Sequence, residues 1–366
     1  MSKQNELVEL ARTGASGGGG NKNLVINGDM AIAQRGTSST TDSYKTVDRF
    51  RNNIGGPSIT QTQETLTSGD PYDLGFRHFY RQTNTSASSA TSSNVQLLQI
   101  IEAQDIASSG WNYTSSSSYI SVSFWVRSSL AGTYPVCFRT YDGTSYWYAS
   151  EFTIAANTWT KITKKVSGNS NLQFDSNNGA GLQVNVSPHF GTDFTDSGFV
   201  FDQWAAFNGS SRSKDYAQDW GNTVNATFDI TGVQVEVGEK ATDFEHRTFA
   251  DELAKCQRYF LMFKPETSTG IAHAGFFNGG GRSGTAVYGV LHFPVEMRLR
   301  PAKAHSGTLT WYFYNTSTSV GSVTINGSTN HSAEIVLTVS SASNMIGSAG
   351  WLRIQSGAYI TFDAEI

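Results

Sequence analysis

Charged residues are scarce in this sequence. They make up 15% of its 366 residues, against about 25% in typical globular chains. The 26 basic and 30 acidic residues give a formal net charge of −4, and neither sign forms a long run. We therefore expect no basic face for phosphate and no nucleic-acid partner. Much of the polar surface must come from Ser, Thr, Asn and Gln.

Cysteine and long apolar runs are also scarce. The two cysteines, Cys137 and Cys256, lie far apart in apolar segments, which excludes a disulfide framework and predicts buried free thiols. No run approaches the roughly 18 apolar residues of a membrane span, so no membrane insertion is expected. The first residues lack the apolar core of a secretory signal.

Motifs for metals and cofactors are missing. The seven histidines show no zinc-ligand spacing. Residues 14–18 match the nucleophile-elbow pattern and residues 279–284 the dinucleotide fingerprint. Neither has the strand and helix context that its chemistry needs. We predict no cofactor and no catalytic residues.

What is abundant points to strands. Aromatic residues reach 12% and there are 36 glycines, a composition typical of strands joined by tight turns. Apolar and polar residues alternate at 120–127, 182–187 and 233–237, with turn-forming residues between these runs. The pattern predicts an all-β chain with an antiparallel sandwich or jelly roll.

The N-terminal residues differ from this pattern. Leu7, Val8 and Leu10 give residues 2–12 a weak helical stripe, and a glycine-rich run follows at 13–20. An isolated helix this short is marginal in water. The segment is either a tether that docks elsewhere or a disordered terminus.

One internal helix is predicted. Thr248 and Asp251 fit a helix cap, and apolar residues recur at three- and four-residue steps up to Phe263, before Pro265. Strand patterns return from about residue 270. The predicted division is a tether (1–22), a jelly roll (23–247), a linking helix (248–264) and a smaller β domain (265–366).

Two stretches resemble a family of phage tail-fibre and virion-associated proteins. They are residues 23–36, expected to open the jelly roll as a strand, and residues 230–247, which close it. Residues 293–301 also recur in such proteins. Between them, residues 99–103 and 121–127 look like strands of carbohydrate-binding modules.

The resemblance implies a structural protein of the virion. It favours a homotrimeric tail fibre or receptor-binding subunit, made in the host cytoplasm, attached to a tail adaptor through its N-terminal segment and contacting host surface polysaccharide. A capsid-decorating or head-fibre protein is the alternative, and a glycan-degrading fibre is the third reading. The last would need two converging carboxylates, for which loop acids are available: Asp193, Asp196, Asp202, Asp215 and Asp219.

Modules of this kind often hold a structural calcium ion, and Glu102 and Asp229 lie in the matching strand contexts. Because calcium needs six or more oxygen ligands, no ligand set is assigned.

Aromatic side chains are the candidate glycan-binding residues, because sugar rings stack on exposed aromatic faces. One group surrounds a predicted hairpin and the other follows in a polar segment: Tyr141, Tyr146, Trp147 and Tyr148, then Trp204 and Trp220. A sandwich also needs an aromatic core, so each of these rings has a second reading as a core residue.

Overall fold

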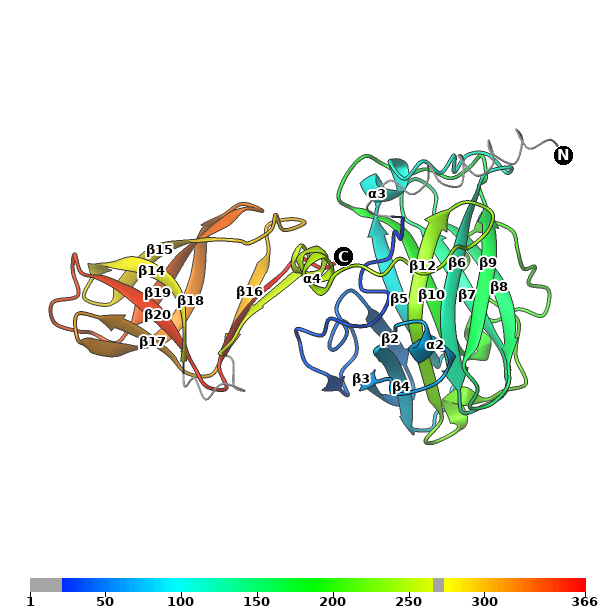
Figure 1. The fold of residues 1–366 in the computed structure, drawn as a ribbon, viewed down its shortest axis with the longest axis horizontal. Helices are drawn as coiled ribbons and strands as arrows, with labels where there is room; N and C mark the ends of the chain where they lie inside the picture. The colour runs from blue at the N-terminus through cyan, green and yellow to red at the C-terminus, as the bar shows by residue number, and fades with distance from the viewer. Residues whose placement is uncertain (1–21, 266–272) are drawn as a thin grey trace.

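The computed structural model describes residues 22–265 and 273–366, and most of its elements are strands (Figure 1). A larger body is drawn in blue to green and a smaller one in yellow to red, with α4 (Phe249–Gln257) between them. The predicted tether residues Leu7, Val8 and Leu10 lie outside the described residues. The all-β fold class is confirmed.

The larger body is a sandwich of two six-stranded antiparallel sheets. The first sheet contains, in spatial order, β1 (Ser38–Ser39), β3 (Ser58–Thr65), β4 (His78–Ser86), β12 (Thr227–Val237), β6 (Tyr119–Ser128) and β9 (Thr160–Ser167). The second contains β11 (Ala205–Ala206), β8 (Tyr146–Ile154), β7 (Gly132–Thr140), β10 (Ala180–Phe190), β5 (Asn94–Glu102) and β2 (Arg51–Gly55). Short helical turns complete it: α2 (Asp70–Asp73), α3 (Ala103–Ala107), η1 (Thr192–Phe194) and η2 (Trp220–Asn222).

The chain crosses repeatedly between the two sheets, which gives the expected jelly roll. The predicted alternation decides which face of each strand is buried. In β6, Ile120, Val122 and Phe124 enter the main core, whereas Trp125 belongs to a separate cluster on the outer face. Period-two patterning therefore fixes the inner and outer faces of the sandwich.

The opening segment, residues 23–36, is not the strand that the sequence predicted. Side-chain amides replace strand pairing there. Asn27 donates from Nδ2 to the carbonyls of Ile32 and Asp48 and accepts from the amide of Ile32, all at 2.9 Å. Asn27 and Met30 both have φ of 60°, which a regular strand does not allow.

The two stretches that carry the family resemblance meet in space. Asn23 donates from Nδ2 to the carbonyl of Val233 and accepts from the amide of Val235, each at 3.0 Å. The backbone amide of Asn23 donates to the Glu245 carboxylate at 2.8 Å. Arg247 donates to the carbonyl of Asn23. These residues fasten the first described segment to the last strand of the sandwich, so their role is structural.

The linking helix is shorter than predicted. Thr248 caps it, accepting from the amide of Asp251 as expected, but α4 ends at Gln257. Residues expected to continue the helix form β13 (Phe260–Phe263), which pairs with β21 (Tyr359–Asp363). This aromatic and apolar run fits a helix as well as a strand, and pairing with β21 decides the outcome.

The smaller body is a closed barrel beside a three-stranded sheet. Around the barrel run β14 (His273–Ser283), β15 (Ala286–His292), β19 (Ser332–Val339), β18 (Thr316–Ser328), β17 (Leu309–Phe313) and β20 (Ala349–Gln355). The sheet consists of β13, β21 and β16 (Ala302–Ser306). Their apolar faces form a second core around the fully buried Trp311.

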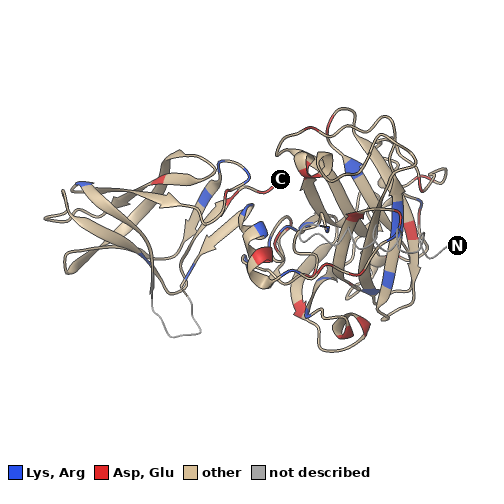
Figure 2. Cartoon of the chain, turned by 45° about the horizontal axis from the view of Figure 1, so that its top comes forward, with Lys and Arg blue, Asp and Glu red and all other residues tan. Residues whose placement is uncertain are grey.

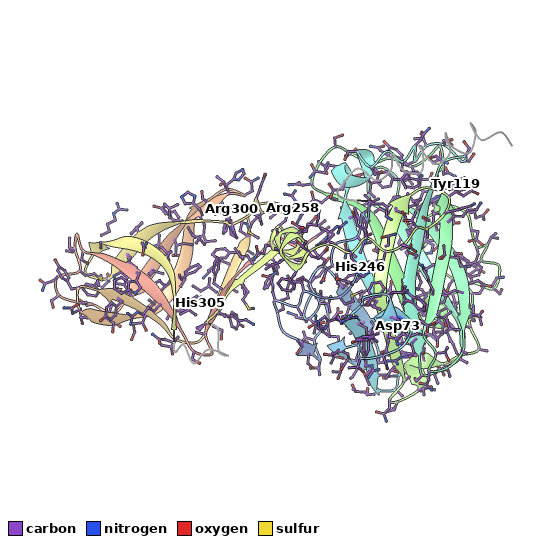
Figure 3. The ribbon with its side chains drawn as sticks, in the orientation of Figure 1. Asp73, Tyr119, His246, Arg258, Arg300 and His305 are labelled. Carbon is purple, nitrogen blue, oxygen red and sulfur yellow. The ribbon has the colours of Figure 1, made fainter. Side chains whose placement is uncertain are left out.

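Charged groups gather where the two bodies meet, around α4 (Figure 2). Arg258, labelled beside α4 in Figure 3, donates to both oxygens of Glu102 at 2.8 and 2.9 Å. From the sandwich, Arg35 and Arg49 form ion pairs with Glu365 near the end of the chain. Arg298 of the smaller body donates from Nη1 to the carbonyl of Asn178 in the sandwich at 2.9 Å. Ion pairs and hydrogen bonds, rather than a shared apolar core, connect the bodies.

Candidate functional site

A groove of about 200 Å³ crosses the outer face of the second sheet. We call it the cross-strand groove, because each of five adjacent strands contributes to it. Its lining from the strands is Arg51, Asn53, Gln96, Leu98, Ile100, Gln183, Arg139 and Trp147, with Tyr141, Phe207 and Arg212 from loops. Five strands at about 4.8 Å spacing span about 19 Å. An extended ligand that crosses the strands fits this shape better than a compact one.

Cross-strand pairing positions the floor of the groove. Gln183 on β10 lies opposite Ile100 on β5 and Arg139 on β7, and Arg139 lies opposite Trp147 on β8. All four point away from the sandwich core, because their chain neighbours point into it. One row of the sheet therefore presents an apolar, an amide, a cationic and an aromatic side chain side by side.

Tyr141 stands at the end of this row, directly after β7. Its hydroxyl donates to Oε1 of Gln183 at 2.6 Å, and the Arg139 guanidinium lies 5.0 Å from its ring centroid. Burial raises the pKa of Tyr141, while the charges of Arg139 and Arg51 act in the opposite direction. The phenol is therefore a neutral hydrogen-bonding group beside two cations.

The loop between β10 and β12 forms one wall. Phe207 packs on Trp147 with ring centroids 5.6 Å apart, and Arg139 lies 3.8 Å above the Phe207 ring. The Trp147 indole donates to the carbonyl of Arg212 at 2.9 Å. This arrangement holds Arg139 and Arg212 at the same side of the groove. Burial lowers the pKa of Arg212, and the nearby Arg139 charge lowers it further.

The structure brings two of the six predicted aromatic residues to this groove. Tyr141 is partly exposed, but Trp147 lies on the floor with 4% of its surface accessible. Tyr146 packs against the main core. The prediction of stacking platforms was wrong at three further rings, because these rings fill the core of the sandwich: Tyr148, Trp204 and Trp220.

The two acids considered for calcium are bound by arginines instead. Glu102 accepts from Arg258 and from the hydroxyl of Tyr259, the latter at 2.6 Å. Asp229 accepts from Arg81 and Arg127, each at 2.7 Å. Their oxygens are therefore satisfied by protein donors and do not fit a calcium site. Within 22–265 and 273–366, no three His, Cys, Asp or Glu side chains form a group that could hold a metal.

Three of the five loop acids considered for a glycan-degrading fibre fasten the loops that carry them. Asp196 accepts from the Gly198 amide at 2.8 Å, Asp219 accepts from the Asn222 amide at 3.2 Å, and Asp215 accepts from Thr195. Capping of this kind is an ordinary structural use of acidic residues.

A serine and a histidine do meet in a second hollow, of about 420 Å³. Oγ of Ser93 lies 2.7 Å from Nε2 of His189. Gly221 covers the ring so closely that a Cβ there would lie 2.4 Å from it. In the described residues no carboxylate is hydrogen-bonded to this histidine. A nucleophile needs an open face and an oriented base, so the pair fits a structural role.

A hollow of about 1060 Å³ lies at the junction between the bodies. Its cations include Arg247, Arg258 and Arg298, and each of these already binds a carboxylate or a carbonyl of the fold. The hollow is therefore lined by the ion pairs that join the bodies.

Sequence reasoning missed most of the groove, including Arg51, Arg139, Gln183, Phe207 and Arg212. Polar residues at the outward positions of β5 and β10 were a usable signal, because Gln183 alternates with core residues. Sequence reasoning also missed a cross-strand pair on the outside of the barrel. The ring centroids of Tyr312 and Trp351 lie 4.9 Å apart there, and Trp351 is 37% exposed.

No helix in the described ranges is long and apolar enough to cross a membrane. No family model and no curated protein matches the chain. Among solved structures, the enzymatically active domain of bacteriophage CBA120 tailspike protein 4 is 11% identical over 59% of this chain and 22% of that chain, with a TM-score of 0.34.

Two similar structures are carbohydrate-binding domains. A family 4 carbohydrate-binding module is 11% identical over 58% of this chain and 98% of its own, with a TM-score of 0.30. The N-terminal cellulose-binding domain of a Cellulomonas fimi β-1,4-glucanase is 6% identical over 58% and 99%, with a TM-score of 0.28. At these identities and TM-scores, none of these likenesses supports a function for this chain.

Proposed function

We propose that this chain is a non-enzymatic structural protein of a bacteriophage particle, a tail-fibre or receptor-binding subunit. In this proposal the cross-strand groove contacts glycans on the host surface. A tail adaptor or another virion protein would bind the N-terminal segment through Leu7, Val8 and Leu10, and three copies would associate.

The observation that carries the glycan part is the make-up of the groove. Carbohydrate sites combine aromatic surface with a few well-placed polar groups. Here Tyr141 offers a ring edge and a hydroxyl, and Gln183 and Asn53 offer amides. All of them stand on or directly beside paired strands, which hold them more rigidly than a free loop would.

The virion part is supported by the resemblance of residues 23–36 and 230–247 to phage tail-fibre proteins. A capsid-decorating or head-fibre protein built from the same module is the alternative. The two differ in where residues 1–20 attach. Imaging the intact particle with an antibody against this chain separates them: label on the tail supports the proposal, and label on the head contradicts it.

Binding to host envelope polysaccharide tests whether the cross-strand groove is the glycan site. Tyr141→Ala is expected to weaken binding of the full chain to host envelope polysaccharide by about tenfold, the loss of one aromatic contact and one hydrogen bond. Trp351→Ala, on the outside of the barrel, is the matched control and should bind as the wild type does.

Unchanged binding by a folded Tyr141→Ala protein would reject the groove as the site, and loss with Trp351→Ala alone would move it to the barrel. Release of oligosaccharides from the polysaccharide would instead favour the glycan-degrading reading.

A further inference from the structure

Resting on the proposed glycan-binding function, we infer that the cross-strand groove selects an anionic sugar residue. The recognised group is a carboxylate, sulfate or phosphate carried by the glycan, held by Arg51, Arg139 and Arg212.

The positive charges in the groove support the inference. The three arginines come from β2, β7 and the β10–β12 loop and line one groove. In the described part of the chain none of them forms an ion pair. Most other arginines of the sandwich and the junction pair with acids, and Arg77 and Arg298 donate to backbone carbonyls instead. The paired arginines are Arg35, Arg49, Arg81, Arg127, Arg247 and Arg258. In a chain with few charges, three converging unpaired cations are an exception that an external anion would explain.

Guanidinium donors without a hydrogen-bond partner also support the inference. The Nε atoms of Arg51 and Arg212 are buried and have no hydrogen-bond partner. No side-chain hydrogen bond is found for either guanidinium within the described residues. Arg139 uses only Nε, which donates to Ser145 at 3.1 Å, and its terminal nitrogens have no partner there. Guanidinium groups present planar forks of donors that match carboxylate and phosphate oxygens.

The orientation of the Arg139 guanidinium supports the inference as well. Stacking on Phe207 occupies one face of Arg139, which fixes the plane of the guanidinium and leaves its edge for hydrogen bonds. Next to this edge, Oε1 of Gln183 already accepts from Tyr141, while its Nε2 has no partner among the described residues. A sugar ring on the apolar floor of Leu98 and Ile100 would therefore meet amide donors along its hydroxyls and arginines at its charged end.

Small matched probes test the inference on the full chain. Methyl β-glucuronide, glucose 6-sulfate and glucose 6-phosphate are compared with neutral methyl β-glucoside. The readout is the NMR signals of the arginine Nε–H groups, assigned through Arg51→Gln and Arg212→Gln. We expect the signals of Arg51 and Arg212 to shift with at least one anionic sugar, and the neutral glucoside to bind about tenfold more weakly or worse. Which anion shifts them most identifies the charged group.

Variants extend the test to polysaccharide. Arg139→Gln should reduce binding of a uronate-containing polysaccharide by about tenfold, and Arg139→Lys should restore only part of it, because the charge returns without the fork. Arg77→Gln, directly before β4 of the first sheet, is the control and should change nothing. Reducing the uronate carboxyls to alcohols should abolish the difference between wild type and Arg139→Gln.

Equal binding of neutral and anionic sugars, or anionic binding that survives Arg139→Gln in a folded protein, would overturn the inference and leave glycan binding intact. Absence of binding to neutral and anionic glycans alike would overturn the proposed function and the inference together.

Discussion

Asp48 is a fully buried carboxyl group beside the junction. Burial raises its pKa to about 6, although Arg35, with Nη1 3.6 Å away, lowers it in part. In the unfolded chain an aspartate titrates near pH 3.9. Between these values the folded state binds more protons than the unfolded state. The contribution of Asp48 to stability is therefore complete below about pH 4 and is lost as the pH rises through 6.

Two measurements check this. The side-chain carbon signal of Asp48 should titrate with a midpoint near pH 6, and Arg35→Gln should move the midpoint upward. Between pH 4 and 6, the stability of the wild type should fall relative to Asp48→Asn by up to about 3 kcal/mol, the free-energy equivalent of the pKa difference. A midpoint near 4 would show that water reaches the carboxyl group.

At the scale of elements, Asp229 ties three strands of the first sheet together. It lies on β12 directly opposite Arg81 on β4 and Arg127 on β6. The Asp229 side chain is 1% exposed, and those of the arginines are 30% and 27% exposed. Either arginine alone still compensates the buried carboxylate. Removal of both leaves it unpaired, which is far more costly than loss of a surface pair.

A double-mutant cycle therefore has a defined outcome. Arg81→Gln and Arg127→Gln are each expected to cost about 1 kcal/mol in urea unfolding, and the double variant is expected to cost more than their sum. The exposed pair of Lys165 and Glu239 is the matched control, and Lys165→Gln should leave stability unchanged. Additive losses at Asp229 would mean that water already solvates this carboxylate.

The strands themselves were predictable, because alternation of apolar and polar residues is a local property of the sequence. The predicted run at 120–127 is β6, and the run at 182–187 lies within β10. The helix boundary was not predictable, since apolar residues after Gln257 fit a helix as well as a strand. Pairing with β21, about a hundred residues later in the chain, decides the outcome there.

The site was less predictable than the fold. Tyr146, Trp147 and Tyr148 are neighbours in sequence, yet only Trp147 faces the groove, since successive residues of a strand point to opposite faces. Alternation shows that two faces exist but does not show which one a distant loop covers. Arg212 reaches the groove from such a loop, and no local pattern connects it with Arg51 or Arg139.

At the scale of the whole molecule, side chains of the sandwich bind the last residues of the chain. Glu365 pairs with Arg49, whose side chain is only 1% exposed, and with Arg35 at 3.2 Å. The carbonyl of Ile366 accepts from the Tyr44 hydroxyl at 2.9 Å. Since the two bodies have separate apolar cores, we expect these polar contacts to make them unfold together rather than one after the other.

Calorimetry of Glu365→Gln tests this coupling. The substitution leaves the buried Arg49 without its charged partner, so we expect a loss of about 3 kcal/mol. We also expect the single thermal transition to split in two as the smaller body unfolds independently. Asp363→Asn removes a neighbouring acid whose side chain is 46% exposed and which also contacts Arg35, and it should keep one transition because exposed pairs contribute little. If both variants unfold in one transition, contacts other than those of Glu365 couple the bodies, and the pair of Arg258, directly after α4, with Glu102 of the sandwich is the next to test.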